Sequence, residues 1–287
     1  MTAGRNARVL VTGSRGRIAR RLRARTDEST DWRWASSRPE HPSEIWLDPT
    51  SRESWAEALG RERPDVVVHL AAATPGSATP IEAALASTAD AVAHLISAAS
   101  SSGVRRVVLA SSAAVYGDRT AEPRRETDAP APRGEYGRAK AESEELLTAA
   151  VGRGVIPEAV ILRPFNVFGA PMTDSLISKL LRSEQAAPVI LHGWDDFVRD
   201  YVHVEEVAEA FEVAAGHDLA GPLLIANVGR GIPVSNRALV AELALARDAP
   251  LHYRVTEGEP SVSVADVSVL ASTLGLRPQR GPAFGLT

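Results

Sequence analysis

The chain has 287 residues, 44% hydrophobic and 24% charged, so it is long enough to bury a core and too apolar to be disordered. Cysteine is absent, which excludes disulfides, thiolate metal sites and cysteine nucleophiles. The 36 acidic and 32 basic residues give a formal net charge of -4 without a concentrated basic cluster, so we expect no nucleic-acid partner.

Membrane insertion and secretion are also not expected. The longest apolar stretches, such as residues 66–73, fall far short of the roughly 20 residues that a membrane-spanning helix needs. The segment before Thr12 lacks the apolar core of a secretory signal. We therefore expect a cytoplasmic protein with no membrane partner.

Short apolar runs alternate along the first part of the chain with segments long enough for helices. This alternation predicts an α/β fold with a Rossmann-type, doubly wound parallel sheet. An Ala-rich segment at 82–101 predicts a packed helix, ended by Gly103. The runs that predict strands are 9–11, 32–35, 45–47, 66–70, 107–110 and 159–162.

The strand signal weakens beyond Gly169, where we expect a smaller carboxyl-terminal substrate-binding lobe. Helices are predicted there at 174–182, 205–215 and 236–247, and the Pro- and Arg-rich segment 118–134 predicts a surface loop. The resulting domain hypothesis is a dinucleotide-binding domain of residues 1–165, to which 199–230 return, and a substrate lobe of 166–198 and 231–287.

A glycine-rich turn lies between the first predicted strand and an Arg-rich helix. In that context backbone N–H groups can reach a pyrophosphate, and Ala19 stands where the dinucleotide-binding pattern allows Gly or Ala. A tight turn without a ligand is the alternative. We expect cofactor contacts from Gly13, Ser14, Arg15, Gly16, Arg17 and Ile18.

The end of the second predicted strand bears on which dinucleotide binds. An NAD site places a carboxylate there for the ribose 2′-hydroxyl, but this chain has Ser36, Ser37 and Arg38. Arg38 and Arg15 can instead converge on a 2′-phosphate. The sequence therefore predicts NADPH/NADP, with Ser37 and Arg38 in the site, and NAD is the alternative if these arginines meet by accident.

Tyr136 and Lys140 are four residues apart, so they share one face of a helix. A tyrosine is a poor acid–base group at neutral pH, but a neighbouring ammonium stabilises the phenolate and lowers the phenol pKa. The chain has only two lysines, Lys140 and Lys179, which makes a chance pairing uncommon. This spacing predicts a pair that transfers a proton to or from a carbinol or carbonyl.

Ser111 and Ser112 follow the predicted strand at 107–110. They therefore lie at the carboxyl edge of the sheet, where ligands bind in open α/β folds. Ser112 is suited to hold a substrate oxygen, although a serine in this place can also cap a turn.

Together these motifs resemble the extended short-chain dehydrogenase/reductases, in particular the branch that acts on nucleotide-diphosphate sugars. The resemblance covers nearly the whole chain. It runs through residues 12–19, Asp48, 69–72, 111–117, 136–140, 163–169 and 199–204.

The resemblance implies roles for individual residues. Ser112, Tyr136 and Lys140 resemble the catalytic triad of the family, with Lys140 also at the nicotinamide ribose. Asn166 and Arg199 resemble the residues that hold the substrate diphosphate. Further cofactor contacts are expected from Asp48 near the adenine and from Leu70, Ala71, Ala72, Ser111 and Pro164, and a substrate contact from Ala113. A homodimer packed through 88–101 and 136–151 is also implied, and no metal is expected.

Departures from the family pattern narrow the expected reaction. Ala113 and Ala114 stand where sugar dehydratases carry an Asp–Glu pair, so elimination is not expected. The acid–base pair of 3,5-epimerising relatives is missing as well, and the segment 256–260 lacks a second arginine that many relatives aim at the diphosphate. The leading hypothesis is NADPH-dependent reduction of a nucleotide-linked 4-keto-6-deoxy sugar by hydride transfer with Tyr136 as proton donor. The alternatives are an NAD-dependent nucleotide-sugar 4-epimerase and a catalytically idle NADP-binding regulator.

Overall fold

A seven-stranded parallel sheet forms the centre of the computed structural model, which describes residues 7–26, 30–72, 81–117 and 122–285. The strand order is β11-β6-β5-β4-β1-β2-β3, so the expected doubly wound α/β sheet is confirmed. The strands are β1 (Arg8–Thr12), β2 (Asp31–Ser36), β3 (Ile45–Trp46), β4 (Val66–His69), β5 (Arg106–Ala110), β6 (Glu158–Pro164) and β11 (Leu223–Val228).

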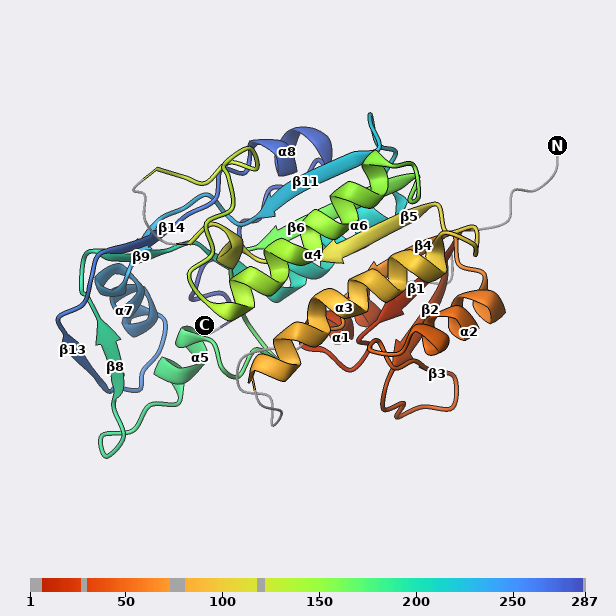
Figure 1. Ribbon diagram of the computed structural model, residues 1–287. Helices are drawn as coiled ribbons and strands as arrows, with labels where there is room; N and C mark the ends of the chain where they lie inside the picture. The colour runs from red at the N-terminus through yellow and green to blue at the C-terminus, as the bar shows by residue number, and fades with distance from the viewer. Residues whose placement is uncertain (1–6, 27–29, 73–80, 118–121, 286–287) are drawn as a thin grey trace.

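Helices cover both faces of this sheet. In Figure 1, α3 and α4 lie in front of the strands and α6 lies behind them. The sheet-covering helices are α1 (Arg17–Arg25), α2 (Arg52–Glu62), α3 (Ile81–Ala99), α4 (Glu135–Gly152), α6 (Val204–Gly216) and α8 (Ser268–Thr273). The homodimer expected through α3 and α4 stays a prediction.

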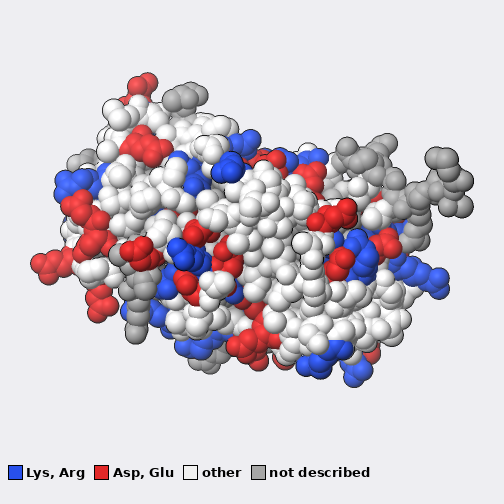
Figure 2. Space-filling model, turned by 90° about the horizontal axis from the view of Figure 1, so that it is seen from above, with Lys and Arg blue, Asp and Glu red and all other residues white. Residues whose placement is uncertain are grey.

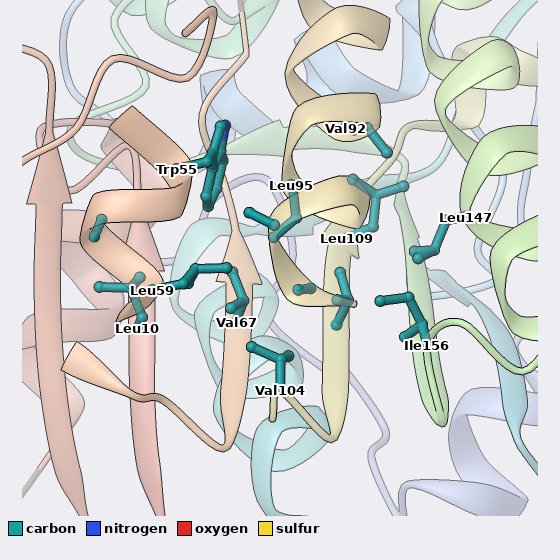
Figure 3. Packing of buried hydrophobic residues seen from close by; sticks show 14 of the residues in the cluster. Leu10, Trp55, Leu59, Val67, Val92, Leu95, Val104, Leu109, Leu147 and Ile156 are labelled. Carbon is teal, nitrogen blue, oxygen red and sulfur yellow. The ribbon is translucent and has the colours of Figure 1, made fainter. Parts of the chain in front are cut away.

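The core consists of two layers because successive strand side chains point to opposite faces. Leu10 packs with α2, α3 and α4, whereas Val9 and Val11 pack on the other face with α1 and α6. Figure 3 shows the first layer, in which Leu109 of β5 lies between Leu95 and Leu147 of the covering helices. Burial on both faces explains why these strands read as continuous apolar runs.

A smaller carboxyl-terminal lobe lies at the end of the sheet toward which the strands point (Figure 1). It contains more strand than expected, because its strands are only two to four residues long and leave little periodic signal. Its own buried cluster includes Phe168, Leu180, Leu191 and Leu239. The elements between β6 and the chain end, apart from those of the central sheet and its helices, are β7 (Asn166–Phe168), α5 (Leu176–Leu181), β8 (Val189–His192), β9 (Phe197–Arg199), β10 (Tyr201–His203), β12 (Val234–Ser235), α7 (Asn236–Leu245), β13 (Tyr253–Thr256) and β14 (Ser261–Ser263).

Acidic and basic side chains are interspersed over the face shown in Figure 2. Among the described residues, many acidic and basic side chains form ion pairs, as in Arg8–Asp31 and Arg25–Glu212. Within the described ranges, no helix is long and apolar enough to cross a bilayer.

The central layer gives a stability prediction. Leu109 is 1% exposed, and its truncation in Leu109→Ala should lower the free energy of unfolding by about 2–5 kcal/mol through lost burial and a residual cavity. Leu245→Ala is the matched control, because Leu245 is 90% exposed and its truncation should change stability by less than about 0.5 kcal/mol. Urea denaturation of both variants measures the difference, and equal losses would contradict the two-layer core.

Candidate active site

The glycine-rich turn approaches the end of β4 too closely for a side chain. Gly13 has a φ of +70°, and a Cβ there would lie 2.7 Å from the backbone nitrogen of Ala71. The turn is closed by a hydrogen bond of 2.8 Å from the Gly16 N–H to the Gly13 carbonyl, and α1 begins at the next residue. The turn therefore has the shape and the free helix N-terminus that suit a dinucleotide pyrophosphate.

Ser112 and Tyr136 come together because α4 packs tightly against the short 3-10 helix η1 (Ala113–Val115). A Cβ on Gly137 would lie 2.5 Å from the Ala114 carbonyl oxygen, so only glycine permits this approach. The Ser112 hydroxyl caps η1 by accepting from the Ala114 N–H at 3.2 Å. Burial raises the pKa of Tyr136, and a hydrogen bond with Ser112 opposes that rise.

Lys140 lies one turn further along α4 and is buried. Its ammonium donates a hydrogen bond of 2.7 Å to the Ala110 carbonyl, and its Nζ lies 5.9 Å from the centre of the Tyr136 ring. Burial lowers the pKa of Lys140 to about 8, while the charge of Glu144 opposes this decrease. The amine therefore stays mostly protonated at neutral pH, as stabilisation of a phenolate requires.

A cavity of about 810 Å³ brings most of the predicted site residues together. It extends from the glycine-rich turn past Tyr136 to the carboxyl-terminal lobe, so one space reaches both halves of the predicted site. The predicted residues that line it are Arg15, Gly16, Arg17, Ile18, Leu70, Ala72, Ser111, Ser112, Tyr136, Pro164, Asn166 and Arg199.

A second cavity of about 260 Å³ borders the same turn, and Pro49, Thr50 and Thr88 also line it. Of the remaining predicted residues, it contains Gly13, Ser37 and Ala71.

Five predicted residues line neither cavity: Ser14, Arg38, Asp48, Ala113 and Lys140. Ser14 is buried and donates from its backbone N–H to the Ala35 carbonyl, and Lys140 is 3% exposed. The carboxylate of Asp48 accepts hydrogen bonds from the N–H and the hydroxyl of Thr50. Asp48 thereby fixes the turn that carries Thr50, which lines the second cavity.

The proposed 2′-phosphate pair is only partly assembled. Arg15 reaches the segment after β2, but its guanidinium pairs with Glu40 and donates to the backbone carbonyl of Arg38 at 3.4 Å. The Arg15 Nε is buried and has no hydrogen-bond partner within the described ranges. Arg38 contributes its backbone, and not its side chain, to this contact.

Short strands of the carboxyl-terminal lobe form the end of the cavity away from the glycine-rich turn. The Asn166 amide donates to the Asp200 carbonyl at 3.1 Å. Arg199 stacks on Phe197 at 3.7 Å and donates to the hydroxyl of Ser261 at 2.8 Å. Ser261 thus fixes the guanidinium, which lies partly exposed in the cavity wall.

Sequence reasoning missed several residues of the cavity, and most of them come from short elements without a motif, whereas Ala19, Phe165 and Val167 lie inside quoted motifs. Asp174 forms an ion pair with Arg17 and so joins the lobe to the first helix. Tyr201 lies within the quoted 199–204 motif, which was a signal that could have identified it. The other missed lining residues are Ala19, Ala110, Phe165, Val167, Met172, Ser175, Leu176, Ile190, Leu191, His192, Phe197 and Asn236.

Comparisons with known proteins agree with this geometry. The sequence profile described as "NAD dependent epimerase/dehydratase family" matches residues 9–229. A UDP-glucose 4-epimerase of Azospirillum brasilense is 30% identical over 97% of this chain and 89% of its own length. One from Streptomyces lividans is 31% identical over 65% of this chain and 62% of its own length.

Solved structures give the same result. MoeE5 in complex with UDP-glucuronic acid and NAD has a TM-score of 0.85 and 30% identity, covering 98% of this chain and 96% of its own. The UDP-glucose-4-epimerase from Stenotrophomonas maltophila, with bound NAD and formylated UDP-arabinopyranose, has a TM-score of 0.84 and 25% identity, with 97% and 95% covered. Sequence and structure together show that the chain belongs to the NAD-dependent epimerase/dehydratase family.

Proposed function

We propose that this protein is an NAD-dependent 4-epimerase of a UDP-linked hexose. The observation that carries the proposal is the single cavity that joins the glycine-rich turn, the Ser112–Tyr136 pair and Arg199. Ala113 and Ala114 follow Ser112, so no carboxyl or thiol group stands there to promote elimination or a second proton transfer. The arrangement suits proton and hydride exchange at one carbon.

The residues of the site divide the acid–base work. Ser112 orients the reacting hydroxyl, and Tyr136 removes its proton in the oxidation half of the cycle. The keto sugar then rotates in the cavity and presents its other face, and Tyr136 returns the same proton to its oxygen. Ser112 and Tyr136 therefore end each cycle in the state in which they began it. Lys140 supplies the positive charge that stabilises the phenolate in between.

The chain has a suitable place for the dinucleotide. Gly13 and Gly16 leave the turn free of side chains, and the N-terminus of α1 attracts the pyrophosphate. Ser37 and Thr50 line the second cavity, which is placed for the adenosine. When bound, NAD accepts and returns a hydride. Arg199 is the cation placed for the substrate diphosphate at the other end.

The relatives support the epimerase over the reductase favoured by sequence reasoning, because the curated relatives named above are UDP-glucose 4-epimerases and the structural neighbours contain NAD. One observation favours NADPH-dependent keto-sugar reduction as a second candidate. β2 ends in Ser36, followed by Ser37 and Arg38, without the carboxylate that an NAD ribose needs.

One experiment separates the two candidates. The purified protein is denatured to release and identify its bound dinucleotide, and fresh protein is incubated with UDP-glucose while the sugar anomeric signals are followed by proton NMR. Co-purified NAD and formation of the 4-epimer without added cofactor support the proposal. Empty protein that oxidises NADPH only with keto sugars would replace it with the reductase.

Tyr136→Phe should lower turnover by about 100- to 10 000-fold, since the variant has no hydroxyl to carry the proton. Cofactor content should stay unchanged because the aromatic ring remains. Tyr253→Phe is the control, as Tyr253 lies on the lobe surface, 37% exposed. Initial rates measure the effect, and a fully active Tyr136→Phe variant would refute the assignment of Tyr136.

Arg38→Ala tests the cofactor choice. With NAD as the cofactor, the variant should bind NAD within about twofold of the parent, because the Arg38 side chain has no anion to contact. If a 2′-phosphate binds there, NADPH affinity should instead fall about 10- to 100-fold. Arg33→Ala, on the preceding strand β2, is the control, and fluorescence titration with both dinucleotides measures the affinities.

The buried amine predicts a cost in stability. The pKa of Lys140 is near 8 in the folded chain against an ordinary 10.5, so keeping the charge at pH 7 costs up to about 3 kcal/mol of folding free energy. Lys140→Met should therefore be more stable than the parent at pH 7, and inactive. Between pH 8 and 10.5 the unfolded parent binds more protons than the folded parent, so the free energy of unfolding of the parent rises with pH. The difference in stability between Lys140→Met and the parent, the stability gap, therefore narrows.

Urea denaturation at several pH values measures this gap. Lys179→Met is the control, because Lys179 is exposed and is the other lysine of the chain. A gap between Lys140→Met and the parent that does not depend on pH would contradict the lowered pKa.

A further inference from the structure

Two hydrogen bonds of opposite polarity join α4 to the end of β5. The Lys140 ammonium donates to the Ala110 carbonyl at 2.7 Å, and the hydroxyl of Ser111, the first residue after β5, donates to the Glu144 carboxylate. Lys140 and Glu144 are one helical turn apart, so both lie on the helix face toward this strand. The strand end that carries Ser112 is therefore fastened by two residues of the same helix.

The carboxylate of Glu144 is itself held by Arg163. Arg163 of β6 donates to one carboxylate oxygen through Nε at 2.9 Å and to the other through Nη2 at 2.5 Å. The Arg163 and Glu144 side chains are 3% and 6% exposed, and the third Arg163 nitrogen, Nη1, donates to the Tyr116 hydroxyl at 2.6 Å. Such a fixed, bidentate pair leaves the carboxylate little freedom to move.

We propose that Glu144 is a positioning residue of the active site, which holds Ser111 by its hydroxyl and, from one helical turn along α4, supplies the counter-charge to the Lys140 amine beside Tyr136. The inference rests on the Tyr136–Lys140 chemistry proposed above. It assigns to the Glu144–Arg163 pair a catalytic purpose beyond holding α4 to the sheet.

The charged and titratable groups around Lys140 are few. Tyr136 and Glu144 lie on its own helix, His69 faces it from β4, and Arg163 lies behind Glu144 on β6. Burial lowers the pKa of His69 to about 3, so this ring is neutral at working pH. The carboxylate of Glu144 is then the group that raises the pKa of Lys140 against its burial.

The two lysines of the chain permit a direct measurement. Protein labelled with lysine carrying carbon-13 at Cε gives one signal for Lys140 and one for Lys179, and a pH titration follows each amine separately. In Glu144→Gln the Lys140 midpoint should fall by about one pH unit or more, since a nearby opposite charge typically shifts a pKa by 1 to 3 units. The Lys179 midpoint should not move.

Two further variants keep the test decisive. Glu145→Gln removes the neighbouring exposed carboxylate and should leave both midpoints and the activity unchanged. Glu144→Gln leaves the buried Arg163 charge without its partner, so this variant can fail to fold. The double variant Glu144→Gln with Arg163→Gln removes both charges together. The Lys140 midpoint should again fall in the double variant.

Kinetics supply the second readout. In folded Glu144→Gln, kcat should fall about tenfold or more near pH 7 while KM stays within about twofold, and Glu144→Asp should restore part of kcat. An unchanged Lys140 midpoint in the folded variants would overturn the inference, whatever happens to stability. The titration needs no substrate, so failure of the epimerase proposal would appear separately, as a parent enzyme that does not convert UDP-glucose.

Discussion

The protonated amine of Lys140, kept out of water, is the constraint on which the arrangement of the site depends. A buried ammonium is costly unless its donors find acceptors and its charge finds a counter-charge. The chain provides the Ala110 carbonyl as an acceptor and Glu144 as a counter-charge, and Arg163 in turn balances Glu144. Much of the polar interior between α4, β5 and β6 follows from this one requirement.

The fold positions that chemistry by placing strand ends at one edge. Parallel strands buried on both faces bring the glycine-rich turn, Ser112 and Pro164 to the carboxyl edge of the sheet, although they are far apart in sequence. Close packing at Gly137 then brings Tyr136 to Ser112. The lobe covers this edge and completes the cavity.

The sequence predicted the sheet well because long apolar runs are a strong local signal for strands. The Tyr–Lys pair is a second local signal in a chain with two lysines, and the structure places Tyr136 beside Ser112 with Lys140 one helical turn away. The catalytic role of these three residues stays a prediction. It was less informative about the lobe, where strands such as β9 and β12 have two or three residues and are stabilised by tertiary packing. Asp174 and Asn236 carry no motif, so their place in the cavity depends on the folded lobe. The choice of cofactor could not be predicted from local signals either, because the sequence does not show which groups the two arginines contact. Arg15 approaches Arg38, but it contacts the backbone carbonyl of Arg38, and its guanidinium forms an ion pair with Glu40.

The position of β11 has a consequence for how the chain folds. This strand pairs with β6, and residues 223–228 follow the segment that builds β7 to β10 in the lobe. During synthesis, β6 therefore remains an open edge until about 60 further residues have been made, and its Ala-Val-Ile-Leu run is exposed to other chains meanwhile. Sheet completion must wait for lobe assembly, which makes the nascent chain most prone to aggregation at this stage.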